Sequence, residues 1–100
     1  MWISENPSHP GEILKFYLED MTISQSALAE KIGCKPPKIN EICSGKRGIT
    51  ADMALMIADA LGTTPQLWMN AQAAWDLGQA LKKSGKKISD YERKLQAIGG

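Results

Sequence analysis

The sequence contains little of what marks a secreted, membrane-bound or disulfide-stabilised protein. Its two cysteines, Cys34 and Cys43, are too few for a disulfide scaffold. Cys43 continues an apolar helical face, as a small core residue does. No apolar run approaches the roughly 20 residues of a membrane span. The opening residues, MWISENPSHPGE, lack the basic and apolar regions of a signal peptide. We therefore expect a cytoplasmic protein with no membrane segment.

The usual signatures of catalysis are also missing. His9 is the only histidine, and no acid or nucleophile stands at a recognisable spacing from it. The chain has no phosphate-binding glycine loop and no set of metal-ligand residues. We therefore expect no enzymatic activity, no cofactor and no metal. His9 is interpreted instead as a structural residue at the entry to a helix.

The residues that are present suit one small helical domain. The chain has 100 residues, of which 43% are hydrophobic, enough for a modest core. Pro10 fits the first position of a first helix. Thr50 and Thr64 are good N-caps for a fourth and a fifth helix, and Gly62 suits the end of the fourth. The first helix has an apolar stripe formed by Ile13, Leu14, Tyr17, Leu18 and Met21.

The stretch from Ser24 to Gly45 predicts two short helices joined by a tight turn. Leu28 and Ile32 share one helical face, and Gly33 follows where a helix end favours a residue that tolerates positive φ. A second apolar set follows at Ile39, Ile42 and Cys43. The small Ala29 allows the two helices to approach closely. The pattern resembles the DNA-binding helix-turn-helix; the alternative is a plain helical hairpin in a bundle core.

Positive charge is concentrated in this motif and in the C-terminal tail. Residues 31–47 carry five basic residues against Glu41, and residues 82–100 carry six against Asp90 and Glu92, so each segment has a net charge of +4. Residues 1–30 have a net charge of −4 and residues 48–81 of −3. Such a distribution would attract a phosphate backbone to the motif. The alternative is an ordinary solvated surface.

The third helix has an unusual beginning. Lys35 occupies the N-cap position, and Pro36 and Pro37 take the first two helical positions, where a missing N–H is tolerated. The first residues of this helix would face base edges in a groove. Proline offers only apolar contact there, for example to a thymine methyl group.

The remaining polar residues of the third helix are few. Lys38, Asn40 and Glu41 are the possible polar readers, since Asn pairs with adenine and Glu accepts from cytosine N4. Glu41 would also repel phosphate. Direct readout should therefore be sparse, with DNA shape and water contributing more of the specificity.

Residues on either side of that helix are candidates for phosphate contacts. Ser24 is a good N-cap for the second helix, which places Gln25 at a helix N-terminus. Lys46 and Arg47 form a basic turn after the third helix, suited to hold a backbone phosphate.

The fifth helix carries two tryptophans, Trp68 and Trp75, spaced seven apart on nearly the same face. One interpretation is that both complete the domain's own core. The other is a dimer seam or partner interface, where aromatic anchors are favoured. We assign Trp68, Trp75 and Leu81 to such an interface, because five short helices leave little core to cover both rings.

The chain divides into a domain over residues 1–81 and a basic linker with a short C-terminal helix over residues 82–100. The linker has the sequence KKSGKK, which suggests a hinge of like charges. Ser89 and Glu92 form a capping-box pattern at the start of the final helix. That helix is too short to be stable unless it docks on its own domain or on a partner.

Two longer segments resemble the HigA antitoxins of the Xre helix-turn-helix class. They are HPGEIL near the start and SGKRGITADMALMIADALGTTPQLWMNAQAAWDL later, and the similarity covers residues 9–81. The resemblance implies an all-α, five-helix lambda-repressor-like DNA-binding domain, followed here by a short C-terminal helical tail. It also implies a homodimer on a palindromic operator in double-stranded DNA. A toxin partner, a HigB-like mRNA endonuclease, would be neutralised, and the operon would be repressed.

The resemblance also assigns residues to DNA contact. The positions that match the family's DNA-facing places are Ser24, Gln25, Lys38, Asn40, Lys46 and Arg47. Four others in the same surface depart from what the family usually has there, namely Lys35, Pro36, Pro37 and Glu41.

Two other functions share the same motif. One is a stand-alone or phage-type repressor with no toxin partner. The other is a protein-interaction module with weak DNA binding, suggested by the proline pair and Glu41.

Overall fold

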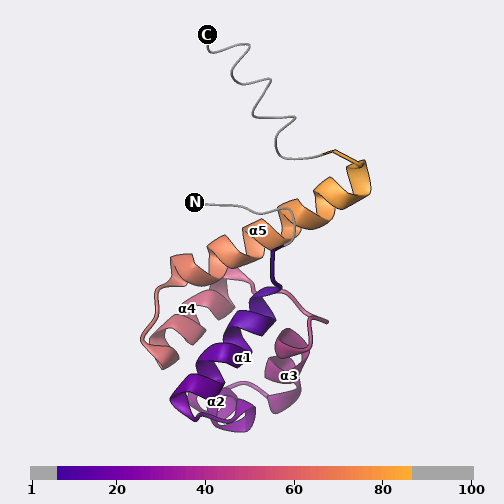
Figure 1. Cartoon of the computed structure of the whole chain (residues 1–100). Helices are drawn as coiled ribbons and strands as arrows, with labels where there is room; N and C mark the ends of the chain where they lie inside the picture. Colours follow the sequence, from indigo (N-terminus) through magenta and orange to yellow (C-terminus); the bar gives the residue numbers. More distant parts are fainter. Residues whose placement is uncertain (1–6, 87–100) are drawn as a thin grey trace.

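Five helices account for the regular structure of residues 7–86, the part of the chain that the computed structural model describes. Their bounds are α1 Pro10–Met21, α2 Gln25–Ile32, α3 Pro36–Cys43, α4 Ala51–Leu61 and α5 Pro65–Ser84. This confirms the all-α, five-helix prediction for those residues. Figure 1 shows α1, α2, α3 and α4 grouped together, with α5 running across them and extending beyond them.

The helices begin where the sequence predicts. The hydroxyl groups of Ser24, Thr50 and Thr64 each accept a backbone N–H from the first turn, so each caps its helix. His9 caps α1 in the same way, because its Nδ1 accepts the Gly11 N–H at 2.9 Å. The predicted structural role of His9 is therefore confirmed. Gly62, with φ 74°, ends α4 in the left-handed conformation expected of it.

The core lies where the inner faces of the helices meet. Leu14, Leu28, Ile39, Ile42 and Ile57 are all completely buried. Met21 lies at the end of the apolar stripe of α1 but is 42% exposed, because the helix ends there and Thr22 turns the chain away.

The assignment of Trp68 to a partner interface is wrong. Its side chain is completely buried in the chain's own core. The indole Nε1 donates to Thr63 Oγ1 at 2.8 Å, and the ring meets Tyr17 edge to face at 5.6 Å. The reason is the position of Trp68 in the first turn of α5, close to where that helix packs against α4 and α1.

Leu81 and Trp75 lie further along the same helix. Leu81 is 6% exposed, so it offers little surface to a partner and its interface assignment is also wrong. Trp75 is half-buried, and its ring meets that of His9 edge to face at 5.1 Å. An interface role for its remaining exposed part stays a prediction.

The long fifth helix passes the predicted domain boundary at residue 81. It continues through Ser84 and ends at Gly85, which has φ 74°. Lys82 and Lys83 are therefore helical, in the last turn, where positive charge is favourable. The linker can begin no earlier than Gly85. The predicted C-terminal helix lies outside the described residues. No helix within residues 7–86 combines the length and the hydropathy needed to cross a membrane.

A glycine sets the distance between α1 and α3. A Cβ atom at Gly11 would overlap the carbonyl oxygen of Ile42, in the last turn of α3. The Ile42 oxygen is a backbone atom and the position of the added Cβ is fixed by the Gly11 backbone, so no side-chain rotation can relieve the overlap. Gly11 is thus required for α1 to support α3 in its observed position.

We predict that Gly11→Ala lowers the free energy of unfolding by about 3 kcal/mol, through this overlap. Helix propensity alone would favour alanine, so the expected sign is opposite to the propensity effect. Urea denaturation measures the change. Gly62→Ala is the matched control, because no neighbouring atom lies within 4 Å of its added Cβ. Only the strain of its positive φ should lower the free energy of unfolding, by about 1 kcal/mol. Equal losses in the two variants would contradict the steric argument.

Candidate nucleic-acid interface

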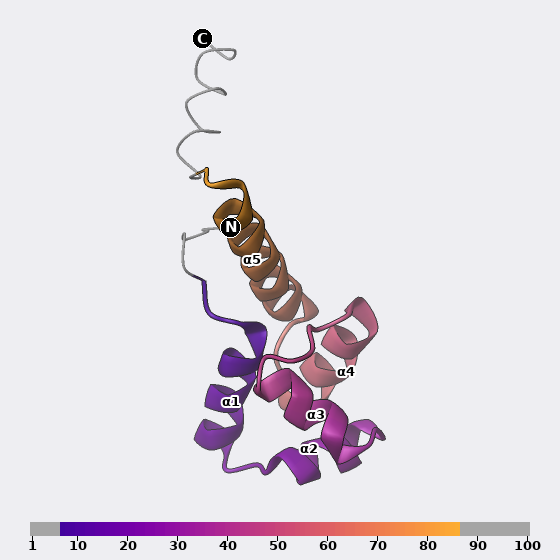
Figure 2. The same ribbon diagram turned by 90° about the vertical axis from the view of Figure 1, so that its right-hand side faces the viewer.

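The two motif helices pack inner face to inner face. Ala29 of α2 and Ile39 and Ile42 of α3 are completely buried. Gly33 ends α2 with φ 88° and turns the chain toward α3. With the apolar side of α3 held inward, its other side must face solvent. Figure 2 shows α3 on the near side of the molecule, in front of the other helices.

The exposed side of α3 carries the residues that the sequence selects as base readers. Pro36, Pro37, Lys38 and Asn40 are exposed and Glu41 is half-buried. Lys35 is the N-cap, as predicted, and its side chain makes no capping hydrogen bond. The first two helical positions have no N–H, and the third N–H, of Lys38, is bonded to the Lys35 carbonyl at 3.0 Å. The start of α3 therefore has no free backbone donors for an anion, and any anion or base bound there would have to contact side chains.

Gln25 and Asn40 are brought together from the two motif helices. The Asn40 Nδ2 group donates to Gln25 Oε1 at 3.2 Å. This leaves Asn40 with its carbonyl oxygen, which can accept from the N6 amino group of adenine, and one N–H, which can donate to adenine N7 in the major groove. It also leaves the Gln25 amide nitrogen with both of its N–H groups for a phosphate. Ser24, by contrast, uses its hydroxyl oxygen to accept the Ala27 N–H at 3.0 Å.

Arg47 and Glu41 form an ion pair at the other end of α3. Arg47 Nε donates to Glu41 Oε2 at 3.0 Å, and a terminal guanidinium nitrogen lies 2.9 Å from the same oxygen. The sequence analysis assigns Arg47 to a phosphate contact and Glu41 to a base contact, and it does not predict that the two side chains pair with each other. Lys35, Lys38 and Lys46 form no ion pair with any carboxylate in the described part of the chain.

The basic turn after α3 is anchored at its far end by a residue that the sequence did not indicate. Gln72 of α5 accepts the Ile49 N–H at 2.7 Å and donates to Asp76 at 2.9 Å. Ile49 is itself buried. An isolated glutamine on a helix has no sequence pattern that would reveal such a role. Gln72 thus connects the turn after α3 to the long fifth helix.

His9 lies near the start of the same turn. A Cβ built on Gly45 would lie 4.0 Å from Cγ of the His9 ring, and the ring also meets that of Trp75 edge to face. Burial lowers the pKa of His9, and this outweighs the raising effects of Glu12 and Asp76. The neutral ring is therefore the form that the fold favours.

The described residues offer little to a metal ion. No three His, Cys, Asp or Glu side chains within residues 7–86 gather closely enough to hold one. Cys34 and Cys43 are free thiols. Burial raises the pKa of the Cys43 thiol, consistent with a core position.

Comparison with known proteins gives a family match and several relatives. The helix-turn-helix family profile matches residues 14–68. Virulence-associated protein I of Dichelobacter nodosus is 48% identical over 73 residues, which make up 72% of this chain and 68% of the relative.

Two solved structures are similar over most of the fold. An addiction module antidote protein of the HigA family from Coxiella burnetii has 45% identity and a TM-score of 0.77, covering 85% of this chain and 94% of that one. The Pseudomonas aeruginosa antitoxin HigA, solved with the higBA promoter, has 40% identity and a TM-score of 0.76, covering 80% and 88%.

We predict that the stability of the protein falls as the pH is lowered below about 6.5, the unperturbed value for histidine. The pKa of His9 is lower in the folded state, so the unfolded chain takes up the proton first. The contribution of neutral His9 to the free energy of unfolding is fully present above that pH, and it is lost as the pH falls toward the pKa of His9 in the folded state. Protonation also removes the Nδ1 acceptor from the Gly11 N–H. Thermal unfolding from pH 7.5 to 5 measures it. His9→Asn keeps a capping acceptor and should lose this part of the pH dependence; an unchanged profile would contradict the assignment.

Proposed function

We infer the function from one premise: the chain belongs to the helix-turn-helix family and, within it, to the HigA antitoxins. We propose that it is a DNA-binding antitoxin, which represses its own operon and neutralises an mRNA-cleaving toxin of the HigB type. The observation that carries the proposal is the exposed polar side of α3, with Gln25 and Asn40 joined beside it and Lys46 on the adjoining turn.

The geometry supports DNA binding in a particular way. Asn40 has the free groups for one adenine, while Gln25, Lys35, Lys38 and Lys46 provide donors for phosphates around it. Base-specific contacts would be few, since the prolines contribute only apolar surface. Most of the affinity would then come from phosphate contacts and would depend strongly on salt.

A dimer completes this function. One copy has a single recognition helix, and two copies would place their helices in successive major grooves about 34 Å apart on a palindromic operator. The relative from P. aeruginosa is named as an antitoxin with a promoter. That observation supports an operator as the target here.

The partner of an antitoxin that blocks an mRNA endonuclease should be basic, because its substrate is a polyanion. The exposed residues of α1 include three acidic ones, Glu12, Glu19 and Asp20, against a single lysine, Lys15, and this net negative charge suits such a partner. We propose no enzymatic activity for this chain itself, and a cytoplasmic location, where operator and mRNA are both present.

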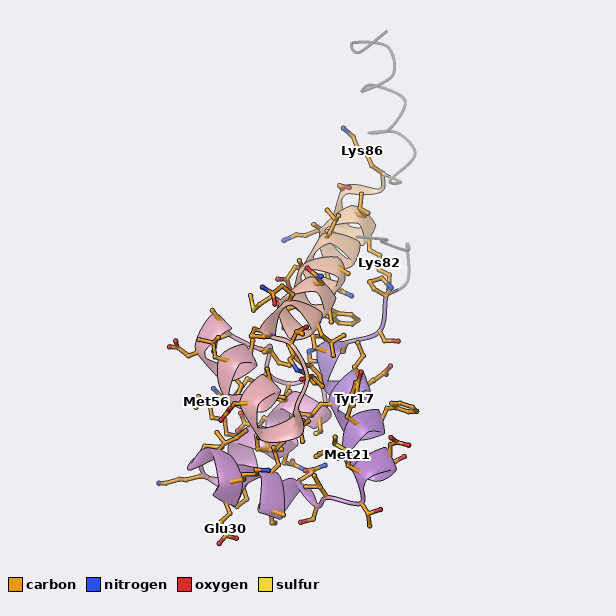
Figure 3. All side chains as sticks on the ribbon, turned by 90° about the vertical axis from the view of Figure 1, so that its left-hand side faces the viewer. Tyr17, Met21, Glu30, Met56, Lys82 and Lys86 are labelled. Carbon is orange, nitrogen blue, oxygen red and sulfur yellow. The ribbon has the colours of Figure 1, made fainter. Side chains whose placement is uncertain are left out.

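We predict that Lys46→Ala weakens binding to the gene's own upstream DNA by a similar factor on all sequences. Loss of one phosphate contact should reduce the magnitude of the salt slope, log K against log salt, by about one. Mobility shifts or fluorescence anisotropy over a salt series measure both quantities. Lys82→Ala is the control with the same charge change, because Lys82 lies on the projecting end of α5 (Figure 3). Two variants with the parental slope would exclude Lys46 as a phosphate contact.

We predict that the chain forms a stable complex with the product of the adjacent gene and relieves the growth arrest that this product causes. The physical reason is the pairing of an acidic antitoxin surface with a basic, RNA-binding protein. Co-expression followed by size-exclusion chromatography and a growth assay tests it. Operator binding without any such complex would favour a stand-alone repressor.

A further inference from the structure

The Glu41–Arg47 pair lies at the edge of the proposed DNA-binding surface, and it has a consequence for affinity. We propose that Glu41 withholds Arg47 from DNA, so that the carboxylate competes with backbone phosphate for the guanidinium group. Glu41 is then a positioning residue that limits operator affinity. This inference rests on the proposed function and specifies how strongly its site binds.

The pairing is built into the backbone at this point. The Glu41 carbonyl accepts the N–H groups of both Lys46 and Arg47, at 2.9 and 3.1 Å. The turn therefore folds back over the last part of α3 and brings the Arg47 side chain close to the Glu41 carboxylate. Gln72 holds the far end of the same turn through Ile49. Contact between the two side chains follows from the path of the chain.

The two side chains engage each other through one carboxylate oxygen. The Nε and one terminal nitrogen of the Arg47 guanidinium both approach Oε2 of Glu41. A phosphate would use the same kind of charge-assisted contact. The exposed fractions of the Arg47 and Glu41 side chains are 47% and 41%, so DNA can reach the pair. Surface ion pairs are weak and screened by salt, so phosphate is a real competitor.

Either outcome of the competition lowers affinity. If the pair persists on DNA, Arg47 is neutralised and releases no counterion. If Arg47 moved to a phosphate, Glu41 would be left as an unpaired negative charge beside the duplex, and this cost opposes the move. Lys46, on the same turn, forms no ion pair with any carboxylate among residues 7–86 and pays neither cost. Adjacent basic residues of one turn are thus unequal in their contribution to binding.

The test compares Glu41→Gln with the parent on the gene's upstream DNA and on unrelated DNA. The variant should bind about fivefold more tightly at 0.1 M salt, and the magnitude of its salt slope should rise by about 0.9, the value for one added phosphate contact. The gain should be equal on both DNAs, because phosphate contacts carry no sequence information. Asp59→Asn is the control with the same charge change. Asp59 lies on α4 beside the shallow pocket lined by Leu55 and Pro65, and it should give neither gain.

The double variant Glu41→Gln with Arg47→Ala shows whether the gain passes through Arg47. Its salt slope should return to the parental value. A slope that stays steep would overturn the proposal, because simple removal of a negative charge would then account for the gain. Unchanged or weaker binding by Glu41→Gln alone would also overturn it, and a loss confined to the upstream DNA would identify Glu41 as a base reader. If the parent itself fails to bind that DNA, the proposed function fails; if only the variant fails to gain, the inference alone does.

Discussion

The structure depends on the burial of one side of α3. Ile39 and Ile42 are completely enclosed, and Ala29 allows α2 to lie close against them. Gly11 allows the backbone of α1 to approach the last turn of α3 from another direction. An eight-residue helix is too short to be stable alone, so these contacts are what make α3 a helix at all. They also fix its rotation, and the rotation decides which residues face outward.

The turn after α3 is held just as firmly. His9 lies beside Gly45 at its start, and Gln72 binds the Ile49 amide at its end. Between these supports the chain exposes Lys46 and Arg47, and both of their amides are bonded to Glu41. The basic residues therefore lie on a defined loop. Electrostatic attraction to a duplex is useful for specific binding only if the charges have fixed positions relative to the reading helix.

Local signals in the sequence were sufficient for the helices and for the outward residues of α3. Serine and threonine caps, glycine ends and apolar spacing depend on neighbours a few residues away, so they can be read from the chain directly. Contacts between distant segments could not be predicted in this way. Trp68 and Trp75 share a face of one helix, yet the first is buried and the second half-exposed. Trp68 lies in the main core cluster, whereas Trp75 meets only one side of the domain, through the His9 ring. Gln72 and the bond between Gln25 and Asn40 are of the same long-range kind.

The proline pair shows why these long-range contacts matter for recognition. Many helix N-termini bind anions through free backbone N–H groups. Here the first two are absent and the third is occupied, so α3 cannot use that contact. The polar groups that remain lie further along the helix, and a lone side chain there would be free to rotate. The Gln25–Asn40 bond removes part of that freedom, because it restrains an amide that would otherwise lose rotamer entropy on binding. The prolines remove backbone N–H groups from the start of α3. The hydrogen bond between Asn40 and Gln25 partly compensates, because it orients a side-chain amide further along the same helix. Under the proposed function this surface offers few base contacts, so we expect the charges around it, on Lys35, Lys38, Lys46 and the Glu41–Arg47 pair, to set how tightly it holds a duplex.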